Sequence, residues 1–190
     1  MVCPEGREDA FLIDPGDGLG ALQEALKSSG RTLRAILLTH GHFDHILAAQ
    51  PLADAAGAKV YIHALDADML SDPDKSAYSP EVCRLTPPVG LAWEAYGDRV
   101  EVCGQALKVL STPGHSLGSV CLYDEEGGIL FSGDTLFQAG YGRTDLFGGS
   151  DRDMVKSLRF LLTELPGNVA VYPGHGESTA LGRERRRYGL

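Results

Sequence analysis

Cysteine is scarce in this chain, and its placement excludes one kind of metal site. Four cysteines are present, and none belongs to a C-x-x-C pair or lies beside a histidine motif. A closed structural zinc site built on thiolates is therefore not expected. We expect all four to be reduced thiols, with Cys103 and Cys121 as small buried residues of strands.

Basic charge and long apolar runs are also lacking. The net charge is −9 and the pI is near 5, which argues against nucleic-acid binding because that needs a basic face. No apolar run approaches the length of about 18 residues that spans a bilayer, and the N-terminus has no signal-like apolar core. We therefore expect a cytoplasmic protein with neither a nucleic-acid nor a membrane partner, and the sequence favours no oligomeric state.

What the chain does contain fits a single globular domain, which we place at 1–190. Its 190 residues are 43% hydrophobic, enough for a core that needs no staples. The one basic cluster, Arg183 to Arg187, is expected to be a solvated helix end, with an anionic-ligand or subunit contact as the alternative.

Strands and helices alternate in the first half of the chain, which predicts an α/β fold. Strands are expected at Ala10–Asp14, Arg34–Thr39 and Lys59–Ile62, and helices at Leu19–Lys27 and from Ile46 to Ala56. Residues 71–97 carry scattered prolines and are expected to form a long surface excursion. The second half is richer in strands, which are expected at Val100–Cys103, Ala106–Ser111, Ser119–Tyr123, Ile129–Ser132 and Val169–Tyr172. A helix is expected at Asp151–Leu165, capped by Ser150 or Asp151.

One string dominates the candidate chemistry. Residues 40–45 read H-x-H-x-D-H and lie between a predicted strand and a predicted helix. One regular element cannot aim four such groups at one point, but a tight loop leaving a strand can. Pro-Gly-His at His115, Gly-Asp-Thr at Asp134 and Pro-Gly-His at His175 each follow another predicted strand. Strand ends of this kind build the sites of open α/β sheets, so we expect all four segments to converge on one rim.

Together these motifs supply five histidines and two aspartates as metal ligands. They are His40, His42, Asp44, His45, His115, Asp134 and His175. Neutral imidazole and carboxylate suit Zn²⁺, Fe²⁺ and Mn²⁺, and seven ligands suit two ions that share a carboxylate. We predict two divalent ions, with zinc first and iron or manganese as alternatives. Taken singly, each later motif is more often a turn, whereas the ordered set favours a metal site. His63 lies outside every motif and is expected to be structural.

The motifs resemble those of the metallo-β-lactamase superfamily over nearly the whole chain. The resemblance implies an α/β fold, the αβ/βα four-layer sandwich, in which two mixed sheets flanked by helices carry a dinuclear site. It implies one metal held by His40, His42 and His115 and a second held by Asp44, His45 and His175. Asp134 would bridge the two metals, and Asp14 would orient the loops without binding metal.

Within the superfamily, the segment from Gly133 to Arg143 is similar to glyoxalase II and its short single-domain relatives. Asp134 stands where the best-known β-lactamases carry a cysteine, which disfavours antibiotic hydrolysis. His42 stands where flavo-diiron proteins favour a carboxylate, and the acidic chain lacks the long basic arm of ribonuclease Z.

The resemblance to glyoxalase II implies hydrolysis of a small-molecule thioester such as the glutathione derivative S-lactoylglutathione. Catalysis is then assigned to Asp44 and to a metal-bridging water held by Asp134. Two cations would lower the pKa of that water from about 16 towards 7. The leaving thiolate needs little protonation because a thiol has a pKa of about 8.5.

The chain departs from glyoxalase II in three places. We expect no C-terminal helical domain of the kind that helps those enzymes to grip glutathione, because only residues 176–190 follow His175. Arg143 stands where those enzymes tend to carry a lysine, and Asp145 where they tend to carry a tyrosine. Tyr141 and Arg143 are the candidate substrate contacts, and a loop pairing between Arg143 and Asp145 is an equal alternative. The first seven residues read poorly as a strand, so we expect either that an edge strand before the one ending at Asp14 is missing or that the chain starts late.

Other functions stay open at this point. A persulfide dioxygenase of the same superfamily would hold one Fe²⁺ with His40, His115 and Asp134 and would bind O₂ at the open positions. The acidic charge disfavours a nuclease or other phosphodiesterase. A metal-bound module without catalysis is disfavoured by the complete ligand set.

Overall fold

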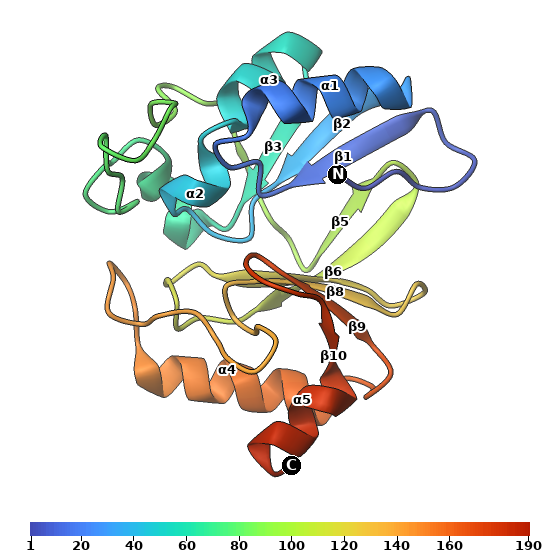
Figure 1. The fold of residues 1–190 in the computed structure, drawn as a ribbon, viewed down its shortest axis with the longest axis vertical. Coiled ribbons are helices and arrows are strands. Elements are labelled where there is room, and N and C mark those ends of the chain that lie inside the picture. The colour runs from blue at the N-terminus through green and yellow to red at the C-terminus, as the bar shows by residue number, and fades with distance from the viewer. The chain divides into compact units, whose positions relative to one another are not determined.

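The computed structural model describes residues 1–190, and Figure 1 shows its ribbon. The chain divides into two compact units. Unit 1 is Met1–Tyr96 with Glu101–Ala106, and unit 2 is Gly97–Val100 with Leu107–Leu190. The expectation of one domain over 1–190 stays a prediction. No helix combines the length and the apolar character that crossing a membrane requires.

Unit 1 is built on a four-stranded sheet in the order β1-β2-β3-β4, whose ladders are all parallel. Its strands are β1 (Asp9–Ile13), β2 (Thr32–Leu37), β3 (Lys59–Ile62) and β4 (Glu94–Ala95). Helices α1 (Leu19–Ser29) and α3 (Ala49–Ala56) lie over the sheet (Figure 1). Leu22 of α1 and Leu52 of α3 pack with Leu33 and Ile36 of β2, so the apolar stripes of both helices close the core of this unit.

The helix predicted from Ile46 to Ala56 is broken in the structure. A short α2 (Phe43–Ile46) precedes α3, and the backbone N–H of Ala48 turns aside to the carbonyls of Pro15 and Gly16, each at 3.0 Å. Pro51 lacks an N–H and therefore fits only the first turn of a helix, which α3 provides. The break ties the histidine loop to the turn after β1.

The first residues pair with β1, which is the edge of its sheet. Val2 and Phe11 exchange two backbone hydrogen bonds of 2.9 and 3.1 Å in an antiparallel bridge. This bridge shields part of an edge that the sequence had led us to expect bare. The segment after β3 forms a 3₁₀ helix, η1 (Ala64–Leu70), and residues 71–93 are irregular as predicted.

Unit 2 carries most of a six-stranded sheet in the order β10-β9-β8-β7-β6-β5. Its strands are β5 (Arg99–Val102), β6 (Gln105–Ser111), β7 (Val120–Asp124), β8 (Ile129–Gly133), β9 (Ala170–Pro173) and β10 (Thr179–Ala180). The β6-β7-β8 pairings are antiparallel, and β8 pairs with β9 in parallel. Helices α4 (Asp151–Glu164) and α5 (Leu181–Tyr188) cover this sheet, with Leu161 and Leu181 in its core beside Leu130 and Val171 (Figure 1).

Two features at the end of the chain differ from expectation. The two-residue strand β10 was not predicted, because its pairing with β9 rather than its own composition defines it. The basic cluster is not simply a solvated helix end. Arg185 donates to the carbonyls of Leu162 and Leu165 at the end of α4, and Glu184 is fully buried. Ser150 caps α4 as predicted, accepting from the N–H of Asp153 at 3.3 Å.

Candidate metal-binding site

The strand ends of unit 1 bring Asp14 to the histidine loop. Strands β1 and β2 are parallel with Ile13 opposite Leu37, so the residues after them leave the sheet at one edge. Asp14 accepts hydrogen bonds from the backbone N–H of Thr39 at 2.7 Å and from its hydroxyl at 2.6 Å. Asp14 has a φ of 47°, a left-handed conformation that aspartate tolerates better than most residues.

Three histidines of the loop are buried side by side. His40, His42 and His45 are 1%, 3% and 3% exposed. The ring centroid of His40 lies 4.9 Å from that of His42 and 4.1 Å from that of His45. Such a cluster could not carry three positive charges in the interior, whereas neutral imidazoles are the form that binds metal.

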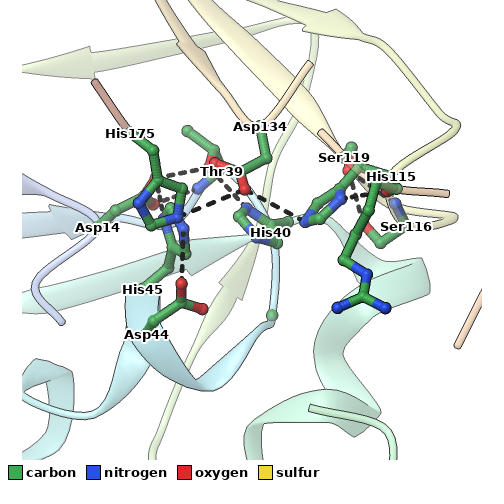
Figure 2. A network of polar contacts seen from close by, with 12 residues as sticks. Asp14, Thr39, His40, Asp44, His45, His115, Ser116, Ser119, Asp134 and His175 are labelled. Atoms are coloured by element: carbon green, nitrogen blue, oxygen red, sulfur yellow. Dashed lines mark hydrogen bonds and ion pairs between the residues drawn. The ribbon is translucent and has the colours of Figure 1, made fainter. Parts of the chain in front are cut away.

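Hydrogen bonds fix which ring nitrogen of two histidines faces the site (Figure 2). His45 donates from Nδ1 to Asp14 at 3.0 Å. The Thr39 hydroxyl gives its one proton to Asp14 and therefore accepts from Nδ1 of His40, at 3.0 Å. Nε2 is thus the candidate ligand atom of both residues, and a carboxylate sets the tautomer of each directly or through a hydroxyl.

Asp14 and Asp44, the two candidate site aspartates of unit 1, differ in their surroundings. Asp14, His40 and His45 offer ligand atoms within 4.8 Å of one another. Both oxygens of Asp14 already accept hydrogen bonds from Thr39 and His45, and the orienting role that the resemblance implied stays a prediction. The Asp44 side chain is 38% exposed, and its Oδ2 lies 3.7 Å from Nε2 of His45.

Asp66 is a buried acid beside the loop that the sequence analysis missed. It is 1% exposed and accepts from the N–H of Gly41 at 3.3 Å. A side chain at position 41 would come within 2.5 Å of Cβ of Met69, so only glycine fits between the two histidines. The short histidine loop, with a glycine between His40 and His42, is the one sequence feature that hints at this close packing. His63 caps η1 by accepting from the N–H of Leu65 at 3.2 Å, in keeping with its expected structural part.

Unit 2 brings its three predicted ligands together. Nε2 of His115 and Nε2 of His175 each lie 3.5 Å from the same Asp134 oxygen, and Figure 2 shows Asp134 between them. Two ligand atoms on a tetrahedral ion with bonds of about 2.1 Å are about 3.4 Å apart. The spacing is long for a hydrogen bond and suits donors that share metal ions. Asp134 is 8% exposed, and its bridging role stays a prediction.

The main chain orients His115. Its Nδ1 donates to the backbone carbonyl of Arg143 at 2.6 Å, which leaves Nε2 as the candidate ligand. The N–H of Gly142 donates to the carbonyl of Asp134 at 2.9 Å. A Cβ at Gly142 would lie 2.1 Å from that carbonyl oxygen and 3.0 Å from Nδ1 of His115. The loop after Asp134 therefore folds back on the ligands without room for a side chain at 142.

Buried hydroxyl groups form contacts beneath the loops that carry His115 and Asp134. The hydroxyls of Thr112 and Thr135, which precede and follow the ligand loops, are 2.9 Å apart. Sγ of Cys121 lies 3.4 Å from Oγ1 of Thr112, and burial raises the pKa of this thiol to about 11. All four cysteines are free, as expected, but Cys103 is only partly buried and its predicted burial is wrong, because it lies with φ of 50° in the β5–β6 turn.

The substrate candidates of unit 2 are exposed. The Tyr141 side chain is 48% exposed. Arg143 donates to both oxygens of Asp145, at 2.6 and 2.8 Å, so the loop pairing is the arrangement in the structure. The hydrogen bond from Arg143 lowers the pKa of Asp145 to about 2.

The family model described as the metallo-beta-lactamase superfamily matches residues 2–175. The chain belongs to the metallo-β-lactamase superfamily. The predicted family and fold class, with two sheets flanked by helices, are thereby confirmed.

Relatives of this superfamily match along most of their length. An uncharacterized protein of Mycobacterium tuberculosis is 39% identical over 94% of this chain and 85% of its own. Hydroxyacylglutathione hydrolase GloC of Haemophilus influenzae is 30% identical over 96% of this chain and 87% of its own.

Solved structures of the superfamily are similar as well. The protein BLEG-1, described as a B3 metallo-beta-lactamase, has a TM-score of 0.90 and 35% identity over 97% of this chain and 89% of its own. The protein TTHA1623 in a di-iron-bound form has a TM-score of 0.82 and 40% identity over 92% of this chain and 85% of its own.

The donors of both units fit the metals of this superfamily. Imidazole nitrogen and carboxylate oxygen are ligands for zinc, iron and manganese, and no thiolate is among them. His40, His45 and His115 each have Nδ1 bonded to a protein atom, as ligating histidines generally do.

Proposed function

We propose that this protein is a metal-dependent thioester hydrolase of the glyoxalase II type, acting on a small glutathione-derived thioester. The observation that carries the proposal is the similarity to a hydroxyacylglutathione hydrolase over 96% of the chain, together with ligand loops oriented as metal sites require. Its setting would be cytoplasmic, with neither a nucleic-acid nor a membrane partner.

The proposed ligand assignment follows the superfamily pattern. His40, His42 and His115 would hold the first ion, Asp44, His45 and His175 the second, and Asp134 both. Bound divalent cations supply water activation near neutral pH, for which a pair of ions shared by one carboxylate is suited. Zinc is the first choice, with iron and manganese as alternatives.

The chain's own residues would then orient the metal-binding histidines and assist the reaction. Asp14 holds the His45 ring, and the Arg143 carbonyl holds the His115 ring, in one tautomer. These rings would therefore not need to reorganise when a metal ion binds. Asp44, with its partly exposed carboxylate, is the proposed catalytic carboxylate beside the water that Asp134 would help to hold. No histidine of the motifs is left as a general acid, and a thiolate leaving group does not need one, since its conjugate acid has a pKa of about 8.5.

Tyr141 and Arg143 are the proposed substrate contacts. Both lie on the exposed part of the loop that follows Asp134. A glutathione carboxylate would have to displace Asp145 from the Arg143 guanidinium, so the pair selects for ligands that offer a well-placed anion.

A second candidate is a mononuclear iron enzyme, the persulfide dioxygenase. One Fe²⁺ on His40, His115 and Asp134 would be a two-histidine, one-carboxylate set. The di-iron form of TTHA1623, at 40% identity, supports iron as an alternative metal, but its two ions match the dinuclear proposal better than this mononuclear one.

The decisive experiment is elemental analysis of protein purified without added metal, followed by activity assays on the same sample. Two ions per chain and hydrolysis of S-lactoylglutathione are expected. One iron per chain with oxygen uptake on glutathione persulfide would replace the proposal by the second candidate. A β-lactam substrate belongs in the same assay, because BLEG-1 is described as a β-lactamase, and turnover of that substrate alone would refute the thioesterase.

Variants locate the activity. His40→Ala and Asp134→Ala should each lower kcat/KM for the thioester at least about 100-fold and reduce bound metal. His63→Asn is the control, because asparagine keeps the cap of η1 and removes the imidazole. Loss of activity in the control with none in Asp134→Ala would overturn the ligand assignment.

A further inference from the structure

A fully buried glutamate lies in the most basic segment of the chain. Glu184 belongs to α5, whose neighbouring side chains are arginines, and it is 0% exposed. A carboxylate removed from water is costly unless its oxygens are bonded. The positions of its partners show what it holds.

Glu184 bonds to three segments of unit 2. Oε1 accepts from the hydroxyl of Thr179 at 2.6 Å, and Oε2 accepts from the backbone N–H of Ala139 at 3.0 Å. Arg187, one turn further along α5, donates to both oxygens at 2.9 and 3.1 Å. Both oxygens of the carboxylate therefore accept two hydrogen bonds each, and two of these four bonds come from residues outside the helix.

The bond to Ala139 fixes a strained turn. Ala139 has a φ of 62°, which costs a non-glycine residue free energy, so surrounding contacts must hold it. Phe137 closes the same turn by donating from its N–H to the carbonyl of Gly140 at 2.8 Å. The carboxylate of Glu184 thus holds the middle of the loop whose ends are Asp134 and Arg143.

That loop controls all three candidate ligands of unit 2. Beyond the turn, Gly142 bonds back to Asp134 and the Arg143 carbonyl accepts from His115. Before it, the Phe137 ring lies edge-on to the ring of His175, with centroids 6.1 Å apart. Thr179, the other partner of Glu184, follows His175 by four residues on the way to α5. One carboxylate therefore touches the loop that begins at Asp134 and bonds to His115, and also the segment that follows His175.

We propose that Glu184 is a positioning residue for the metal ligands of unit 2, acting through the 137–143 loop and Thr179. This inference rests on the proposed metal site and adds the part played by the C-terminal helix. The basic cluster then acts inside the fold, because Arg187 balances the charge of Glu184 and Arg185 fastens α5 to the end of α4.

Co²⁺ binding to the metal-free protein tests the inference without an activity assay. Glu184→Ala should raise the Kd for Co²⁺ about 10- to 100-fold and change the visible absorption of the bound ion, because the ligand geometry has loosened. Arg185→Ala is the matched control, since it removes a neighbouring anchor of the same helix, whose side chain donates to the Leu162 and Leu165 carbonyls at the end of α4. It should lower the Tm while leaving the Kd within about twofold and the spectrum unchanged.

The outcomes separate positioning from plain stability. A Glu184→Ala protein that is folded by circular dichroism and binds Co²⁺ like the wild type would overturn the inference. An Arg185→Ala protein with an equally altered spectrum would also overturn it, since any loosening of α5 would then suffice. If Glu184→Ala does not fold, Thr179→Val decides, because it removes one bond to the carboxylate at little change in shape and should shift the Kd several-fold in the same direction. Wild-type protein that takes up no Co²⁺ would instead refute the proposed metal site itself.

Discussion

Unit 1 orients its histidines with side chains, whereas unit 2 orients His115 with the main chain. In unit 1 the Asp14 carboxylate accepts from His45 directly and from His40 through the Thr39 hydroxyl. In unit 2 the partner of His115 is the carbonyl of Arg143, and a close-fitting glycine keeps it in place. A carboxylate can be removed by substitution and a carbonyl cannot, so the two units should fail in different ways.

The largest expected effect is steric and lies in unit 2. Gly142→Ala should lower thioester kcat/KM and metal affinity about 100-fold, because its Cβ would lie 2.1 Å from the Asp134 carbonyl oxygen. Gly140→Ala is the matched control, since a Cβ there meets nothing within 4 Å. Elemental analysis and steady-state kinetics on both proteins check this. Equal behaviour of the two variants would mean that the loop yields and does not position His115.

Removing the charge that orients the histidines should have a smaller effect in unit 1. Asp14→Asn keeps the shape and tolerates the φ of 47°, but an amide holds the His45 tautomer less firmly. We expect metal affinity to fall about 10-fold, measured by competition with a chelator. Asp9→Asn on the same strand serves as control, because Asp9 makes only a surface pair with Arg34. If both variants bind metal equally, Asp14 has no orienting part.

The same difference explains what the sequence predicts of the site. The candidate ligands are recognised because their residue types at these spacings are typical of metal chemistry, whereas Asp14 is recognised only through the resemblance to the superfamily. The Arg143 carbonyl and the N–H of Ala139 have no sequence signature, because every residue offers the same groups. Asp66 lies in a 3₁₀ helix with nothing in its neighbours to separate it from a surface acid.

The fold follows a similar rule. Strands such as β2 and β8 are predictable within one or two residues because they are buried apolar runs that stop at turn residues. The break between α2 and α3 is not, because it arises from a bond between Ala48 and the distant carbonyls of Pro15 and Gly16. Arg185 escaped prediction for the same reason, since its partners, the carbonyls of Leu162 and Leu165, belong to another helix.

A milder pair of variants separates the side chain of Arg143 from its carbonyl. Arg143→Ala keeps the carbonyl that orients His115, so we expect KM for a glutathione thioester to rise several-fold with little change in kcat. Asp145→Asn should lower KM, because it weakens the competitor for the guanidinium of Arg143.

The pH dependence of KM tests the same pair. The hydrogen bond from Arg143 lowers the pKa of Asp145 to about 2, so the pair is lost only as the pH falls towards that value. KM should therefore show no transition from this pair between pH 5 and 8. A lower kcat with unchanged KM in Arg143→Ala would remove the side chain from the substrate site.

The smallest expected effect is a difference in the rates at which Cys3 and Cys121 are labelled. Labelling of Cys121 reports whether solvent reaches the buried residues beneath the loops of unit 2. Burial raises the pKa of Cys121 to about 11, so at pH 8 only about one thiol in a thousand would be ionised. Cys3 is exposed and should react with iodoacetamide first, while Cys121 reacts only after unfolding in urea. Mass spectrometry of the labelled protein reads both sites.

The Gly142→Ala variant extends this test, because Sγ of Cys121 lies beside Thr112, which leads into the His115 loop. If the new side chain at 142 pushes that loop open, labelling of Cys121 should become faster. Unchanged labelling in that variant, together with lost metal, would show that the ligands move while the network beneath them stays closed.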